Sequence, residues 1–334
     1  MKLNRNSKIF INYFLGPLLF VWLSWSIYHE IQLQPNLETA WTQIKASFST
    51  PLVWNLVAVI FLMIVNWSIE AIKWRISVRP IQQVSFLKAF RAVLSGVSFS
   101  VSTPNRVGEY LGRVLYMDEG NRLRTISLTI VGSISQLIIT VLFGCIGLII
   151  LKNEIESHQL ISSLWMKVLL SGFIVFLAGL LLFYFRLSWL AKWIDRLPRS
   201  QKFTYLIEAL EDYDTSLLMK LLFLSTLRFA VFILQYYLLF DLFNVPISAW
   251  NCLWTVSLSF LILAVIPSFA IADVGLRGEV GIKIIGLFAL NNLGIIFATI
   301  TIWFINLIVP AIIGSILILG MRKMVRMERI DKSE

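Results

Sequence analysis

The stretch Ser102–Met117, STPNRVGEYLGRVLYM, carries a proline, two glycines, two arginines and a glutamate within sixteen residues. It directly follows AVLSGVSFSV (92–101), a run without a charged residue. Proline interrupts a helix interior, and charge is costly in lipid. We therefore predict that an apolar helix breaks here and that the broken backbone and its charges face protein or water.

The composition places this break inside a membrane protein. Of the 334 residues, 58% are hydrophobic and 14% are charged, and the mean hydropathy is +0.79. Soluble domains are about half apolar and a quarter charged. The net charge of +10 does not indicate nucleic-acid binding, because the lysines and arginines occur in short runs between apolar segments. The sequence predicts an all-α polytopic membrane protein.

Six segments are apolar over about twenty residues, the length that crosses a bilayer. They are Ile9–Tyr28, Leu52–Ile72, Thr125–Leu151, Leu164–Phe185, Leu217–Phe240 and Leu293–Leu319. Two further apolar stretches, around Phe86–Ser102 and Trp250–Ile266, each run into a proline and a polar turn that contains glycine. We predict about six transmembrane helices and two re-entrant helical hairpins, 85–117 and 249–288.

The positive charges predict the topology of these segments, because lysine and arginine accumulate on the cytoplasmic side of membrane helices. Here they gather within 1–8, 73–124, 186–202 and 321–334. Both termini are therefore expected to be cytoplasmic. The first hairpin should enter and leave from the cytoplasm, and the second from outside.

The two halves of the chain form a weak internal repeat. In each half an apolar arm lies between two prolines, 24 residues apart at Pro80 and Pro104 and 21 apart at Pro246 and Pro267. Because the halves start on opposite sides, the repeats are inverted, a construction typical of alternating-access transporters. We predict a single membrane domain, 1–334, made of an N-terminal helix and outside loop (1–50), repeat 1 (51–151), a connecting helix with a cytoplasmic amphipathic segment (152–216), repeat 2 (217–320) and a basic cytoplasmic tail (321–334).

The first charged turn suits a phosphate. After Pro104, a helix would carry Arg106, Glu109 and Arg113 on one face, because their spacing is i, i+3 and i+7. The free N–H groups of its first turn and the guanidinium of Arg106 favour an anion. Gly108 is expected to serve the turn itself.

The second turn, IPSFAIADVGLRGEVGIKIIG (266–286), is built alike. Its candidate binding residues are Asp273, Arg277 and Glu279, and its expected turn residues are Pro267, Gly275 and Gly278. An alternative is open for both turns: Glu109–Arg113 and Glu279–Lys283 would then be ordinary i, i+4 ion pairs at the ends of re-entrant helices.

Two charged residues fall inside predicted spans. Arg228 lies about midway along its helix, so we expect it to face a central cavity; the alternative is that it snorkels toward the cytoplasm. Glu70 lies near the cytoplasmic end of its helix and is expected to pair with Lys73 or Arg75.

Residue types that support catalysis or metal binding are scarce. Cys145 and Cys252 lie in apolar stretches, and His29 and His158 lie in separate polar loops. No P-loop, nucleophile elbow, zinc-protease or dinucleotide motif occurs in the sequence. We predict a protein that is not an enzyme and that needs no metal or cofactor.

The turn motifs TPNRVGEYLGRVLYM and IPSFAIADVGLRGEVGIKIIG resemble those of the lysylphosphatidylglycerol synthase transmembrane-domain family, the flippase-like integral membrane proteins. The resemblance covers nearly the whole chain. Members look like Pro-x-Arg-x-Gly-Glu in the first half and like Pro, a glycine-rich turn and Gly-x-x-Glu in the second. The matching positions here are Pro104, Arg106, Gly108 and Glu109, and then Pro267, Gly275 and Glu279.

The chain departs from this family in two respects. Many relatives have acidic and arginine residues in the helix after the first hairpin, where this chain has Ser133, Ser135 and Gln136. The sequence also stops at Glu334, without room for the soluble synthase domain of the two-domain relatives. The resemblance therefore implies a lipid flippase without synthase activity.

Our leading interpretation is a flippase of a bacterial-type cytoplasmic (inner) membrane that moves an anionic phospholipid or a polyprenyl-phosphate lipid. Arg106 and Arg277 would hold the phosphate, while Glu109 and Glu279 would position these arginines or carry protons. The alternative is an accessory subunit for a glycosyltransferase or other lipid-modifying enzyme. A membrane enzyme acting on polyprenyl phosphate is disfavoured, because no nucleophile and base cluster in the sequence.

Overall fold

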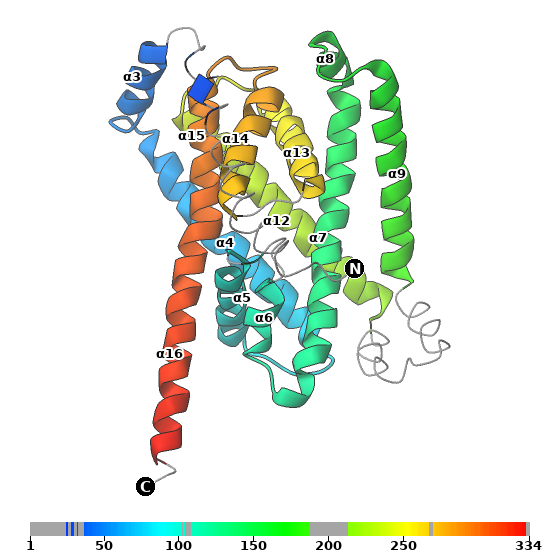
Figure 1. Ribbon diagram of the computed structural model, residues 1–334, viewed down its shortest axis with the longest axis vertical. Helices are drawn as coiled ribbons and strands as arrows, with labels where there is room; N and C mark the ends of the chain where they lie inside the picture. The colour runs from blue at the N-terminus through cyan, green and yellow to red at the C-terminus, as the bar shows by residue number, and fades with distance from the viewer. Residues whose placement is uncertain are drawn as a thin grey trace, which may run out of the picture. The chain divides into compact units, whose positions relative to one another are not determined.

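The structure is a computed structural model that describes residues 37–101, 108–186, 213–266 and 270–331 and the single positions 25, 28, 29, 32 and 103 (Figure 1). These residues form helices and no strand, as predicted. The elements are α3 (Leu37–Ser47), α4 (Val53–Val78), α5 (Phe86–Val101), α6 (Gly108–Val114), η3 (Glu119–Asn121), α7 (Arg122–Ile150), α8 (Lys152–Ser157), α9 (Ser163–Phe185), α12 (Thr215–Leu242), α13 (Ala249–Val265), α14 (Ala270–Ile285), α15 (Asn292–Trp303), the π-helical η5 (Phe304–Ile308) and α16 (Val309–Asp331).

Within the described part of the chain, five helical stretches are long and apolar enough to cross a membrane. They are Val53–Val78, Glu119–Ile150, Ser163–Phe185, Thr215–Leu242 and Asn292–Gly320. They coincide with five of the six predicted spans, so the chain is a multi-pass membrane protein. The sixth prediction, Ile9–Tyr28, lies outside the described residues except at positions 25 and 28.

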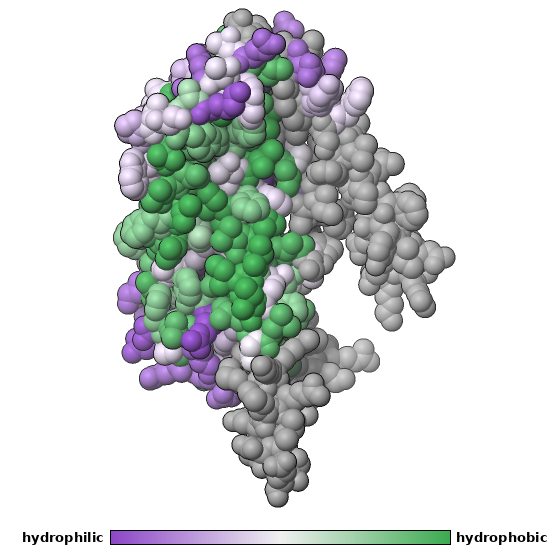
Figure 2. Space-filling view, turned by 90° about the vertical axis from the view of Figure 1, so that its left-hand side faces the viewer, coloured by the Kyte–Doolittle hydropathy of each residue, from purple (hydrophilic) through white to green (hydrophobic). Residues whose placement is uncertain are grey.

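The surfaces of these helices are hydrophobic where a soluble protein would be polar. In the most apolar 18-residue stretch of α9 only 6% is buried inside the protein, and Leu164 and Val175 are each 72% exposed. Figure 2 shows hydrophobic residues over much of the face that it draws. Helices with apolar outer faces are stable in lipid, because their backbone hydrogen bonds are satisfied internally.

The chain divides into two compact units, each assembled from three segments. Unit 1 comprises Met1–Leu62, Thr140–Val175 and Ala230–Phe304, and unit 2 comprises Met63–Ile139, Phe176–Phe229 and Ile305–Glu334. The helices α13 and α14 belong to unit 1, and α5 and α6 belong to unit 2. Each unit thus contains one of the two predicted hairpins. Their re-entrance and the inverted relation of the repeats stay predictions.

In unit 2, glycines bring the two arms of the first hairpin close together. A Cβ atom on Gly112 of α6 would lie 2.5 Å from the Cα atom of Gly96 on α5. A Cβ atom on Gly108 would lie 2.2 Å from the carbonyl oxygen of Phe99. Gly108 is therefore required for close packing, and its N–H donates to the Thr103 hydroxyl at 2.7 Å. Pro104 and Arg106, which belong to the predicted turn, lie outside the described residues.

In unit 1, α13 packs on glycines of α7, where a Cβ atom on Gly147 would lie 2.9 Å from the carbonyl oxygen of Trp254. The turn after α13 corrects one prediction. Gly275 and Gly278, expected in the turn, are buried inside α14, which begins at Ala270. The i, i+4 ion pairs and the mostly apolar residues around these glycines continue the helix. Pro267 lies outside the described residues.

Candidate functional site: a buried charge cluster on Glu70

The centre of the candidate site is the carboxylate of Glu70 on α4, in unit 2. Its Oε1 accepts a hydrogen bond from Nη2 of Arg113 on α6 at 2.8 Å. Its Oε2 accepts from Nη1 of Arg228 on α12 and lies 3.0 Å from Nζ of Lys73, one turn further along α4. Arg113 also donates to Oε1 of Glu109, one turn back on α6. One carboxylate thus contacts three cations from three helices.

The cluster is secluded from solvent. The exposed fraction of the side chain is 6% for Glu70, 3% for Arg113, 2% for Lys73 and 11% for Arg228. Only Glu109, at 23%, is partly open. Three cations and two carboxylates leave a formal charge of +1 at this place. Isolated buried charges are costly, so each member depends on its partners to offset the cost of its burial.

Polar neighbours extend the cluster along α4, α7 and α12. Nε of Arg228 donates to Oδ1 of Asn66 at 2.7 Å. Nζ of Lys73 donates to the hydroxyl of Ser225 at 3.3 Å, and that hydroxyl lies 2.9 Å from the hydroxyl of Ser135. Ser135 occupies the helix where relatives were expected to carry charge. In this chain that helix therefore contributes hydroxyl groups to the cluster.

Three buried donors beside the cluster have no acceptor among the described residues. They are Nε of Arg113, Nδ2 of Asn66 and Nε1 of Trp67. The Trp67 ring also lies beside Arg228, with 5.5 Å between its centroid and Cζ. Buried donors in proteins nearly always find an acceptor. Spare donors together with an excess positive charge make the surroundings of Glu70 suited to an anionic, oxygen-rich group.

The structure unites several residues that the sequence singled out separately. Glu109 and Arg113 form the predicted i, i+4 pair, but Arg113 also reaches Glu70. Arg228 is held by Glu70 and Asn66 inside the protein, so it does not snorkel. Sequence reasoning assigned Glu70 a local pair only. Its position as an acidic residue within an apolar span was the one available indication of a larger role.

The charged residues of α14, in unit 1, form local pairs along that helix. Nε of Arg277 donates to Oδ2 of Asp273 at 2.9 Å, and Nζ of Lys283 lies 3.2 Å from Oε1 of Glu279. Both pairs have i, i+4 spacing, and the Glu279–Lys283 pair is one that the alternative interpretation predicted. Asp273, Arg277 and Glu279 are largely buried, whereas the Lys283 side chain is 58% exposed.

Metal-binding groups do not gather in the part of the chain that the structure describes. No three histidine, cysteine, aspartate or glutamate side chains there come close enough to hold an ion. Cys145 and Cys252 are buried and unpaired as thiols. The chemistry that the described cluster can offer is therefore charge and hydrogen bonding.

Comparison with known proteins adds one match that spans nearly the whole chain. The family described as "Lysylphosphatidylglycerol synthase TM region" matches residues 13–315. Comparison with curated proteins and with solved structures gave no significant match. The matched residues include both hairpins and every member of the Glu70 cluster. The chain belongs to the lysylphosphatidylglycerol synthase transmembrane-region family, whose description ties it to membrane lipids.

Proposed function

We propose that this protein moves an anionic lipid across the membrane and catalyses no reaction on it. The observation that carries the proposal is the cluster on Glu70, where two arginines and a lysine meet within a membrane-spanning protein. An apolar span gains nothing from such a group, because every buried charge costs free energy in lipid. The cluster is explained if an anionic lipid headgroup passes through the protein and binds there.

In the proposed mechanism the headgroup phosphate competes with Glu70 for the guanidinium groups. Arg113 and Arg228 each present planar, bidentate donors that match phosphate oxygens. A phosphate that accepts from both would replace the hydrogen bonds to Glu70 and neutralise the excess positive charge. The released Glu70 would keep Lys73 as its partner, so the cluster could return to its resting arrangement after the lipid leaves.

The hairpin α5–α6 supplies the change of position that transport needs. Arg113 lies on the short helix α6 and bonds both Glu70 and Glu109. A small shift of α6 would move the guanidinium of Arg113 away from Glu70. Glu109 lies on the same helix, so it would move with Arg113 and remain its partner. Arg106 is expected to meet the phosphate first, and Arg277 and Glu279 on α14 are expected to form a second headgroup position.

Reconstitution tests this function directly. Purified protein would be placed in liposomes that contain a fluorescent phosphatidylglycerol or polyprenyl phosphate, and loss of fluorescence to an external quencher would report movement between leaflets. We expect movement that the Glu119→Gln variant retains, because Glu119 is 89% exposed and, among the described residues, forms an ion pair only with Arg122. Movement no faster than in protein-free liposomes, for either lipid, would contradict the proposal.

The placement of the protein in the cell belongs to the same proposal. We propose a bacterial-type cytoplasmic membrane with both termini in the cytoplasm, from the distribution of lysine and arginine along the chain. A polytopic protein there meets anionic phospholipids and lipid-linked precursors in the same leaflet, which are the two lipid classes that the cluster suits.

A further inference from the structure

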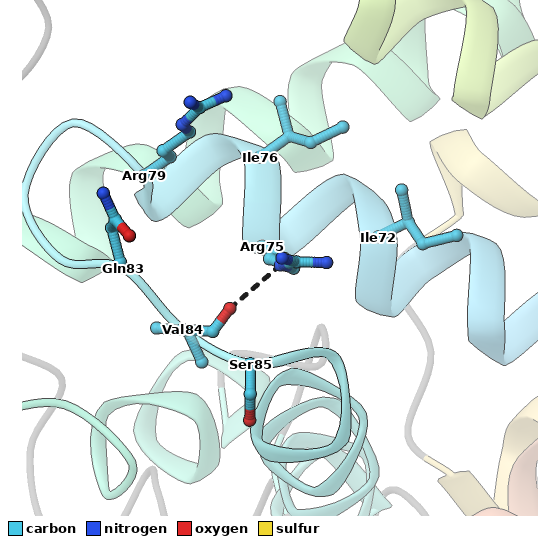
Figure 3. Close-up of a pocket in the computed structure, with 7 residues that line it drawn as sticks. All are labelled: Ile72, Arg75, Ile76, Arg79, Gln83, Val84 and Ser85. Atoms are coloured by element: carbon cyan, nitrogen blue, oxygen red, sulfur yellow. Dashed lines mark hydrogen bonds between the residues drawn. The ribbon is translucent and has the colours of Figure 1, made fainter.

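A pocket of about 580 Å³ lies in unit 2, apart from the residues of the Glu70 cluster. It is formed by the last turns of α4 and the segment that leads into α5 (Figure 3). Its lining residues are Ile72, Arg75, Ile76, Arg79, Gln83, Val84 and Ser85. The volume is within the range of about 300–1,000 Å³ that ligand sites commonly have.

Two arginines provide the polar wall of this pocket. Nε of Arg75 donates to the carbonyl oxygen of Val84 at 2.9 Å, which fixes the guanidinium between α4 and the following segment (Figure 3). An arginine has five N–H donors, so four remain on Arg75 and five on Arg79. Both residues are exposed, and neither has an ion-pairing carboxylate among the described residues.

Apolar side chains of α4 line the same pocket, and further apolar residues are exposed at the start of α5. Ile72 and Ile76 line the pocket, and Ile72 is 37% exposed. At the start of α5, Phe86 and Leu87 are 40% and 56% exposed. Inorganic phosphate has no apolar part that could contact these side chains. A phospholipid has both parts, because its acyl chains lie along apolar side chains while its phosphate meets the guanidinium groups.

We propose that this pocket binds the phosphate of an anionic phospholipid at the membrane interface, as a resident lipid separate from the transported one. Arg75 and Arg79 hold the phosphate oxygens, and Ile72 and Ile76 contact the chains. The site lies at the end of α4 that the positive charges assign to the cytoplasmic leaflet. It does not depend on the transport activity proposed above.

A pair of double variants tests the site. The first is Arg75→Gln with Arg79→Gln. The matched control is Lys88→Gln with Arg91→Gln, which removes the same charge from neighbouring α5 residues that do not line the pocket. Native mass spectrometry would count phosphatidylglycerol and phosphatidylcholine bound to purified protein. We expect the first variant to bind phosphatidylglycerol about tenfold more weakly, as for one lost charge-assisted hydrogen bond, and the control to bind like wild type.

Three outcomes would overturn the proposal. They are equal loss of phosphatidylglycerol in both double variants, equal binding of phosphatidylcholine and phosphatidylglycerol by wild type, and displacement of the lipid by inorganic phosphate at matched concentration. The single variant Arg79→Gln tests whether lost binding is merely a result of misfolding, because the Arg79 side chain makes no hydrogen bond among the described residues. It should weaken lipid binding while the melting temperature stays unchanged. Liposome transport is measured separately. If the lipid binds in an arginine-dependent way but no transport occurs, only the proposed transport function is contradicted.

Discussion

Arg113 donates a hydrogen bond to Glu70 across 2.8 Å, although the two residues are 43 positions apart in the chain. This contact explains why charge gathers in α6, after the helical break that follows α5. The break lets α6 lie against α5 at Gly96 and Gly112, and that packing carries Arg113 inward to the carboxylate of α4. The charged stretch is thus one part of a cluster whose other parts are distant in sequence.

Replacing the central carboxylate should destabilise the protein. Glu70→Gln leaves three buried cations with Glu109 as the one carboxylate of the described cluster that can neutralise them. Breaking a buried pair costs about 3–5 kcal/mol of unfolding free energy. Thermal melting in detergent measures the effect. Glu119→Gln is the control, since an exposed pair contributes at most about 1 kcal/mol. Equal melting temperatures for the two variants would show that Glu70 is not the organising residue.

Removing Arg228 should separate folding from transport. Arg228→Leu takes one cation from the cluster and makes it formally neutral, while Arg113 and Lys73 still contact Glu70. We expect a folded protein whose melting temperature stays within a few degrees of wild type, and whose liposome transport of anionic lipid is lost. Transport at the wild-type rate would mean that Arg228 has a structural role only.

The close contact of α5 and α6 predicts opposite effects for two glycine substitutions. Gly112→Ala would place a methyl group 2.5 Å from Gly96, so the hairpin must open, at a cost of about 1–3 kcal/mol. Gly172→Ala on α9 meets nothing within 4 Å and should leave stability equal or raised, since alanine favours helix over glycine by about 1 kcal/mol. Melting temperatures compare them; a stable Gly112→Ala protein would refute the packing account.

Single cysteines test the predicted topology. Cys145 and Cys252 are buried, and both would first be replaced by alanine. Cysteine at Ser162 or Ala249, both exposed, should react with an impermeant maleimide on intact cells. Cysteine at Gly120 should react only after permeabilisation. Labelling of Gly120→Cys in intact cells would contradict the inverted arrangement of the hairpins.

Local pattern was enough to predict most elements of this fold. Five spans coincide with their predicted positions, because a run of about twenty apolar residues has few alternatives to a membrane helix. Hairpin arms such as α5 and α13 were also expected, because their apolar runs are too short to cross a bilayer and end near a proline. The position of the second turn was missed, because Gly275 and Gly278 were interpreted as turn residues although α14 contains them.

The sequence by itself determined the all-helical membrane fold and the two broken segments, because hydropathy acts over a few residues. It offered the local pairs Glu109–Arg113 and Glu279–Lys283 as one of two alternatives, from their i, i+4 spacing. Only the tertiary structure showed that Glu70 accepts from Arg113 and from Arg228, which is 158 positions away. A charge in an apolar helix must find a partner, but its own sequence does not name that partner. The choice follows from which helix faces approach closely, and here glycines of α5 and α6 set that approach.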